Sequence, residues 1–141
     1  MENGLKFHYD VDGDNFTSAG AASVEVKKKL RQLGFSAELI RRVSIAMYEG
    51  EINMVVHARG GEADVYVDTD CITIVLTDHG PGIKDIELAM QEGYSTAPDN
   101  IRALGFGAGM GLPNMKRYTD EMHIDSEVNV GTTVTMQVLV P

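Results

Sequence analysis

The sequence is poor in cysteine: Cys71 is the only one, and tryptophan is absent. A single thiol cannot form a disulfide within the chain, and it cannot provide the paired cysteine ligands of a structural zinc site. Cys71 begins an apolar, β-branched run, Cys71-Ile72-Thr73-Ile74-Val75-Leu76-Thr77. We therefore expect a buried, unreactive thiol rather than a nucleophile.

Long apolar runs and a basic charge balance are also missing. No stretch approaches the ~18 apolar residues that a membrane-spanning helix needs, and the first four residues lack the basic and apolar regions of a secretory signal. The formal net charge is -9, whereas binding to nucleic acid or to an anionic membrane needs clustered Lys and Arg. These absences predict a cytoplasmic protein that binds neither nucleic acid nor membranes.

The 141 residues suit one domain, 1–141, and the composition is that of an ordinary globular protein. Residue patterns predict strands near 5–11, 63–67, 71–77, 121–126 and 132–140, and helices near 19–33, 37–58, 85–91 and 109–118. Ser18 and Ser36 are the expected N-caps of the first two helices, and Gly34 is expected to end the first. This order predicts an α+β fold, a two-layer sandwich with helices on one face of a mixed, mostly antiparallel sheet.

A polar stripe runs along the second predicted helix. Glu49, Asn53 and His57 follow one another at intervals of four residues, and each step advances about 40° around a helix and about 6 Å along it. Such a stripe could simply face solvent. The neighbouring positions are largely apolar, however, so we expect it to face a cleft instead. Gly50 costs about 1 kcal/mol in mid-helix relative to Ala, which indicates that another element approaches closely there.

A carboxylate and two glycines end the strand predicted at 71–77. The segment Asp78-His79-Gly80-Pro81-Gly82 follows the apolar run at once, although such residues often make nothing more than a turn. Residues 80–108 read as a long loop, which in a compact domain usually has a function. The glycines toward its end are Gly105, Gly107, Gly109 and Gly111. We expect residues 93–111 to move, or to wrap closely around a ligand.

This glycine cluster leads directly into the helix predicted near 109–118. Backbone N–H groups at a helix start can bind an anion such as phosphate, although the glycines alone also fit a flexible loop without a ligand. No G-x-x-x-x-G-K-[ST] motif occurs, which excludes a P-loop. The polar stripe, the Asp-x-Gly-x-Gly turn and the glycine loop, in this order, together indicate a nucleotide site.

In these motifs the sequence resembles the GHKL ATPase superfamily, and within it the small anti-sigma-factor serine/threonine kinases of bacteria, of the stressosome switch-kinase type. The family's N-box, Glu-x-x-x-Asn, is matched by residues 49–53, and its first glycine box, Asp-x-Gly-x-Gly, by residues 78–82. Residues 105–111 match its second glycine box, and residues 131–133 match its Gly-Thr-Thr. The resemblance covers residues 19–140 and implies the Bergerat ATP-binding fold.

The resemblance also implies roles for the matched residues. Glu49 would be the general base, acting on a serine hydroxyl or on water. Asn53 would hold Mg²⁺ against the phosphates of ATP. Asp78 would accept a hydrogen bond from the adenine amino group, with Thr133 nearby. The glycines that would let the backbone approach the nucleotide are Gly80, Gly82, Gly105, Gly107, Gly109 and Gly111.

The implied activity is that of an ATP-dependent serine/threonine kinase in a bacterial partner-switching pathway. Its substrate would be a small antagonist protein, its output would be sequestration or release of a sigma factor or another regulator, and a homodimer would suit the family. Two alternatives stay open: a nucleotide-gated binding module without kinase turnover, and the detached ATPase domain of a histidine-kinase-like system. Tyr48, Gly50 and an insertion at 97–104 depart from the family pattern, which affects the expected rate and partner more than nucleotide binding.

Overall fold

The computed structural model describes residues 4–12, 20–58, 60–83, 86, 90 and 111–141. Along this part of the chain the elements are β1 (Leu5–Asp12), α1 (Ala21–Gln32), α2 (Ala37–Ala58), β2 (Gly60–Val67), β3 (Cys71–Asp78), α5 (Gly111–Arg117), β4 (Glu121–Glu127) and β5 (Gly131–Leu139). The helix predicted near 85–91 falls almost entirely outside the described residues, and so does the loop that follows it.

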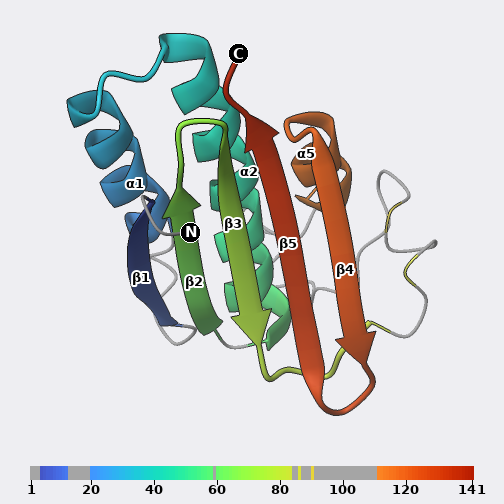
Figure 1. Cartoon of the computed structure of the whole chain (residues 1–141). Coiled ribbons are helices and arrows are strands. Elements are labelled where there is room, and N and C mark those ends of the chain that lie inside the picture. Colours follow the sequence, from blue (N-terminus) through green and yellow to red (C-terminus); the bar gives the residue numbers. More distant parts are fainter. Residues whose placement is uncertain (1–3, 13–19, 59, 84–85, 87–89, 91–110) are drawn as a thin grey trace.

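The five described strands form one sheet in the order β1-β2-β3-β5-β4, and every neighbouring pair is antiparallel. Figure 1 shows α1, α2 and α5 on one face of this sheet, while no described helix covers the other face. The predicted α+β two-layer sandwich is confirmed. The sheet is antiparallel rather than mixed, because even β1 and β2, which are joined through two helices, run in opposite directions.

The hydrophobic core lies between the sheet and the helices. In β3, Ile72, Ile74 and Leu76 are buried, whereas the residues between them are only half-buried. This alternation follows from the geometry of a strand, whose successive side chains point to opposite faces. From the helical layer, Val43 and Met47 of α2 are fully covered. The long second helix therefore lies across the centre of the sheet, where a stripe of its side chains can form one wall of a site.

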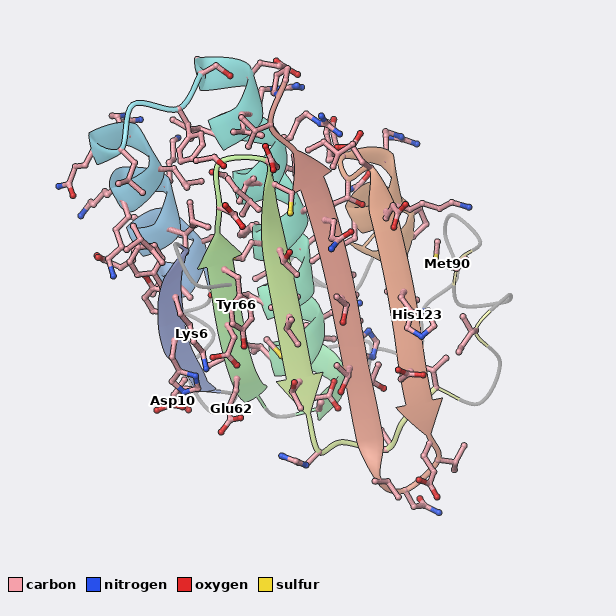
Figure 2. The ribbon with its side chains drawn as sticks, in the orientation of Figure 1. Lys6, Asp10, Glu62, Tyr66, Met90 and His123 are labelled. Carbon is pink, nitrogen blue, oxygen red and sulfur yellow. The ribbon has the colours of Figure 1, made fainter. Side chains whose placement is uncertain are left out.

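The open face of the sheet carries mostly polar side chains. Figure 2 looks onto this face, and the labelled Lys6, Tyr66 and His123 come from β1, β2 and β4. Cys71 belongs to this face as well, where it pairs with Leu139 and is half-buried. The expectation of a buried thiol was therefore wrong, because the first residue of β3 points away from the helices.

The two helix boundaries predicted around residues 34–36 are confirmed. Gly34 has a φ of 85°, its N–H donates to the carbonyl of Arg31, and the N–H of Phe35 donates to that of Leu30. This pair of hydrogen bonds is a Schellman motif, which satisfies the last carbonyls of α1. The Ser36 hydroxyl accepts the N–H of Leu39 at 3.2 Å and caps α2. None of the described helices has the length and apolar character that crossing a membrane requires.

The start of α1 is held by a residue of α2 rather than by its own cap. The N-cap position is Gly20, which makes no side-chain cap, and the predicted cap Ser18 lies outside the described residues. Instead, the buried Glu51 carboxylate accepts the N–H groups of Gly20 at 3.0 Å, Ala22 at 3.3 Å and Ser23 at 2.5 Å. These bonds satisfy N–H groups that a helix start leaves without partners, and they fasten α1 to α2.

Gly50 confirms the expected close approach in the middle of α2. A Cβ atom there would overlap Cδ1 of Leu76 and would lie 3.3 Å from the Sδ atom of Met115. The helix therefore packs directly on β3 and α5 at this level. Since Glu49 and Glu51 flank Gly50, this contact sets the depth at which both carboxylates sit.

Candidate functional site

The polar stripe of α2 lies beside α5 and the end of β3, as a set of close contacts shows. Each member of the stripe has a neighbour from another element. Glu49 accepts a hydrogen bond from α5, and Asn53 packs against the first residue of α5. The negative charge of Asp78 acts on His57. One helical turn separates each contact from the next. The stripe therefore faces other elements along its length, and the cleft expected from the sequence stays a prediction.

Glu49 is half-buried, and its Oε1 accepts a hydrogen bond from Nδ2 of Asn114 at 3.2 Å. Asn114 is itself tied to Arg117, whose Nη1 donates to Oδ1 of Asn114 at 3.5 Å. The candidate base is thus oriented by a neutral amide. Sequence reasoning missed Asn114, because nothing in its local pattern marks a contact with a residue 65 positions away.

Asn53 packs against the backbone of Gly111. A Cβ atom at Gly111 would lie 2.9 Å from Oδ1 and 3.2 Å from Cγ of Asn53, so the amide would have to shift to make room for it. Glycine at 111 therefore leaves room for the Asn53 amide. Gly105, Gly107 and Gly109, which were predicted for the same loop, lie outside the described residues.

His57 lies near Asp78 at the end of α2. Burial lowers the pKa of His57 from its ordinary value of 6.5, and the negative charge of Asp78 partly opposes that shift. The next residue, Ala58, contacts the loop after β3, since a Cβ at Gly80 would lie 2.5 Å from the Ala58 Cβ. The last turn of α2 and the first glycine box therefore touch, and Gly80 is required for the fit.

Asp78 joins the ends of two strands. Its Oδ1 accepts the N–H of Gly80 at 3.0 Å and the N–H of Thr132 at 3.2 Å. Gly131 makes this possible, because its φ of 149° suits glycine and a Cβ there would overlap the Asp78 carbonyl oxygen. The carboxylate is thus held in place by backbone donors on two sides.

The turn after Asp78 is fixed to the hairpin between β4 and β5. Ile83 donates its N–H to the Ser126 hydroxyl at 2.7 Å, and Asn129 donates its N–H to the Pro81 carbonyl at 2.8 Å. Gly82 has a φ of 77°, and a Cβ there would overlap the carbonyl of Glu127. Both glycines of the predicted Asp-x-Gly-x-Gly turn are therefore needed for packing, whatever else they do.

The structure brings Thr132, rather than the predicted Thr133, to Asp78. Thr132 pairs with Asp78 across β3 and β5, whereas Thr133 pairs with Thr77 on the open face. The Thr132 hydroxyl is also 2.9 Å from that of Ser126. Because neighbouring residues of a strand point to opposite faces, Thr133 does not join the cluster, and Thr132 takes its place in the candidate site.

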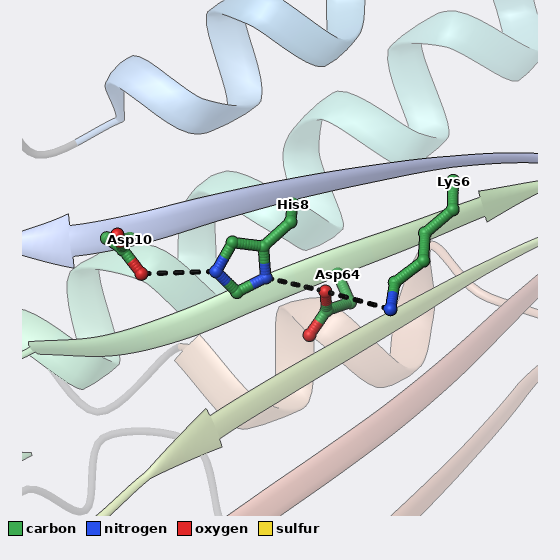
Figure 3. A network of polar contacts seen from close by, with 4 residues as sticks. All are labelled: Lys6, His8, Asp10 and Asp64. Carbon is green, nitrogen blue, oxygen red and sulfur yellow. Dashed lines mark hydrogen bonds and ion pairs between the residues drawn. The ribbon is translucent and has the colours of Figure 1, made fainter.

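A second polar cluster lies on the open face, away from this site. In Figure 3, His8 bridges two carboxylates: Nδ1 is 2.7 Å from Asp64 and Nε2 is 3.1 Å from Asp10. Lys6 adds an ion pair to Asp64 at 3.9 Å. The hydrogen bond to Asp64, followed by that to Asp10, raises the pKa of His8 above 6.5, as expected for an imidazolium held between two anions. The network ties β1 to β2 on the surface.

Sequence comparisons agree with the motifs. The sequence pattern of the histidine kinase-like ATPase domain family matches residues 15–138. An anti-sigma F factor of Clostridium novyi (strain NT) is 33% identical over 122 residues, which is 82% of this chain and 82% of that protein. The serine/threonine-protein kinase RsbT of Bacillus subtilis (strain 168) is 32% identical over 108 residues, which is 74% of this chain and 75% of its own.

Solved structures share the fold. The RsbU and RsbW domains of Rv1364c from Mycobacterium tuberculosis match 96% of this chain and 32% of that longer chain, with a TM-score of 0.63 and 17% identity. The mycobacterial sensor histidine kinase MprB matches 96% of this chain and 97% of its own, with a TM-score of 0.54 and 18% identity. The family assignment made from the motifs is therefore confirmed, and this chain belongs to the histidine kinase-like ATPase domain family.

Proposed function

We propose that this chain is an ATP-dependent serine/threonine protein kinase that phosphorylates a small antagonist protein in a bacterial partner-switching pathway. The observation that carries the proposal is the polar stripe of α2: Glu49 and Asn53 lie one turn apart, beside α5 and toward Asp78. Relatives named as an anti-sigma F factor and a serine/threonine-protein kinase support the same activity.

Phosphoryl transfer relies mainly on positioning and charge neutralisation, for which this arrangement is suited. The Glu49 carboxylate takes the proton of the attacking serine or threonine hydroxyl. The hydroxyl oxygen then forms a bond to the γ-phosphorus, the bond from that phosphorus to the β,γ-bridging oxygen breaks, and ADP leaves. Asp78 accepts the adenine amino group through its carboxylate, which the N–H groups of Gly80 and Thr132 already hold in place.

The residues around Asn53 fit a magnesium ion. Mg²⁺ prefers oxygen ligands and is usually held by one or two protein oxygens together with substrate phosphates. The Asn53 amide supplies such an oxygen, and the absence of a Cβ at Gly111 leaves room for that amide. When bound, Mg²⁺ supplies charge neutralisation for the phosphates of ATP. Gly80, Gly82 and Gly111 would let the backbone approach the nucleotide, and Gly105, Gly107 and Gly109 remain predictions for the same role.

The proposal includes two protein partners. One is the antagonist substrate, and the other is a sigma factor or another regulator, which is released or sequestered. Since ATP is supplied inside the cell, the activity we propose is cytoplasmic. The homodimer expected from the resemblance stays a prediction.

The test is transfer of radiolabelled γ-phosphate from MgATP to a purified antagonist-type domain encoded in the same genome. Glu49→Gln should bind MgATP like the wild type and transfer phosphate about 10²–10⁴-fold more slowly, since it loses the base. Asn53→Ala should weaken binding and transfer together. Asp125→Asn is the matched control, because it changes an exposed carboxylate on the open face.

Two results would contradict the proposal. Undiminished transfer by Glu49→Gln would remove Glu49 as the base. Tight binding of nucleotide by the wild type, without transfer to any antagonist domain or to water, would favour a nucleotide-gated binding module.

A further inference from the structure

Asn114 of α5 makes a side-chain hydrogen bond to the candidate base, Glu49. Its Nδ2 donates to Oε1 of Glu49 at 3.2 Å, and its Oδ1 accepts from Nη1 of Arg117 at 3.5 Å. A carboxylate can only accept a hydrogen bond and a guanidinium can only donate one. Both neighbours therefore require the same orientation of the amide, with its nitrogen toward Glu49.

The backbone beneath Asn114 is firmly anchored. Leu112 and Met115 of α5 are buried in the core at 7% and 1% exposure, and the Met115 Sδ lies against Gly50 of α2. The side chain of Asn114 projects from this anchored turn. Its position relative to Glu49 is therefore set by core packing.

The contact also fits the spacing of the two helices. Gly111 and Asn114 are three residues apart in α5 and so share a face, and they meet Asn53 and Glu49, which are four residues apart in α2. One short helix thus touches both N-box residues at once. A shift of α5 would disturb the candidate metal ligand and the candidate base together.

We propose that Asn114 is a positioning residue for the phosphoryl transfer: its amide holds Oε1 of Glu49 and so fixes the direction in which the carboxylate meets the attacking hydroxyl. This role rests on the kinase function proposed above. A glutamate side chain has several rotamers, and holding one of them removes an entropic cost from the reaction. A neutral amide does so without adding a charge of its own next to the carboxylate.

The experiment compares Asn114→Ala and Asn114→Asp with the wild type, using radiolabelled MgATP and the same antagonist domain. Asn114→Asp keeps the shape of the side chain but replaces the donor with an acceptor. Lys116→Ala is the matched control, because Lys116 is an exposed residue of the same helix. At saturating MgATP we expect transfer to be about tenfold slower in Asn114→Ala and slower still in Asn114→Asp, with the Kd for MgATP changed less than about twofold.

A double variant separates positioning from general structural support. If Asn114 acts through Glu49, then Asn114→Ala should slow transfer no further in a Glu49→Gln background. The contact can also be observed directly by NMR, since the side-chain amide signal of Asn114 should move in Glu49→Gln without any nucleotide. An amide signal that does not move would overturn the contact, and this measurement does not depend on whether Asn114→Ala folds.

The outcomes distinguish this proposal from the kinase function on which it rests. An active wild type with an equally active Asn114→Ala overturns the positioning role alone. The positioning role is also overturned if Asn114→Ala loses MgATP affinity in parallel with its transfer rate, or if its effect on the rate adds fully to that of Glu49→Gln. Either result would indicate a structural role. A wild type that binds MgATP but transfers nothing overturns the kinase function, and the positioning role with it.

Discussion

The carboxylate of Asp78 at the end of β3 accepts the backbone N–H of Thr132 at the start of β5, at 3.2 Å. The same oxygen accepts the N–H of Gly80, so the side chain is held from both adjacent segments. A carboxylate held in this way is ready to receive a donor such as an adenine amino group without first losing rotamer freedom.

Asp78→Asn should separate nucleotide recognition from folding. The amide oxygen of Asn can still accept the N–H groups of Gly80 and Thr132, but its NH₂ group would oppose a donor from adenine. Since a hydrogen bond to a charged group contributes about 1.5–3 kcal/mol, the Kd for ATP should rise roughly 10–100-fold. Calorimetry measures the affinity and thermal unfolding checks the fold, with Asp125→Asn as the control. Equal affinity in Asp78→Asn and wild type would reject the adenine assignment.

Gly111→Ala should weaken magnesium-dependent binding while leaving the fold intact. Ala favours a helix over Gly by about 1 kcal/mol, but its Cβ would press on the Asn53 amide, 2.9 Å from Oδ1. We expect the Kd for MgATP to rise by about tenfold, and the affinity for ATP in the presence of a chelator to change less. If Gly111→Ala binds MgATP as tightly as the wild type, then the Asn53 amide that packs against Gly111 does not hold the metal.

Glu51 should give the stability of the protein a characteristic pH dependence. Burial raises its pKa above the ordinary value of 4.5, although the N–H donors headed by Ser23 oppose the shift. The folded state therefore holds the proton more tightly than the unfolded state, so this contribution to stability is complete below pH 4.5 and is lost as pH rises through the raised folded pKa.

The measurement is urea unfolding of wild type and Glu51→Gln over a range of pH. The Gln variant does not titrate, so the free energy of unfolding of the wild type relative to the variant should fall as pH rises above 4.5 and then level off. A relative stability that increases with pH would mean that the backbone donors outweigh burial. Glu51→Ala should be destabilised by about 1–3 kcal/mol or more, because it leaves the N–H groups at the start of α1 without an acceptor.

Two alanine substitutions in α2 should have different effects on the stability of the protein. Gly50→Ala forces Cδ1 of Leu76 to move, and overpacking of about 1–3 kcal/mol should exceed the gain in helix propensity of about 1 kcal/mol. Ser44 has a buried hydroxyl without a hydrogen-bond partner among the described residues, so Ser44→Ala should be neutral or stabilising. Thermal unfolding of both variants tests the pair. A stabilised Gly50→Ala would show that α2 and β3 are less closely packed than described.

The sequence was sufficient where local chemistry decides the structure. The bounds 37–58 of α2 were predicted correctly, because the Ser36 cap and a long apolar periodicity fix them. The polar stripe was predicted for the same reason, since four-residue spacing on a helix places side chains on one side whatever the tertiary fold. Asp78 at a strand end followed from the glycines that interrupt the apolar run.

The sequence was insufficient where distant segments meet. Choosing between Thr132 and Thr133 required the register of β5 against β3, and a shift of one residue moves every side chain to the other face. The role of Glu51 depends on N–H groups about thirty positions earlier, and that of Asn114 on a glutamate 65 positions earlier. No local pattern carries such information.

The central claim is that ATP binds between α2, α5 and the Asp78 end of β3. NMR chemical-shift mapping with Mg²⁺ and a non-hydrolysable ATP analogue tests it most directly, because it locates the ligand without any mutation. We predict the largest shifts among Asn53, His57, Asp78, Gly80, Gly111 and Thr132. Residues on the open face, such as Tyr66, His123 and Thr135, should hardly move. Large shifts on the open face, with the first group unchanged, would contradict the account.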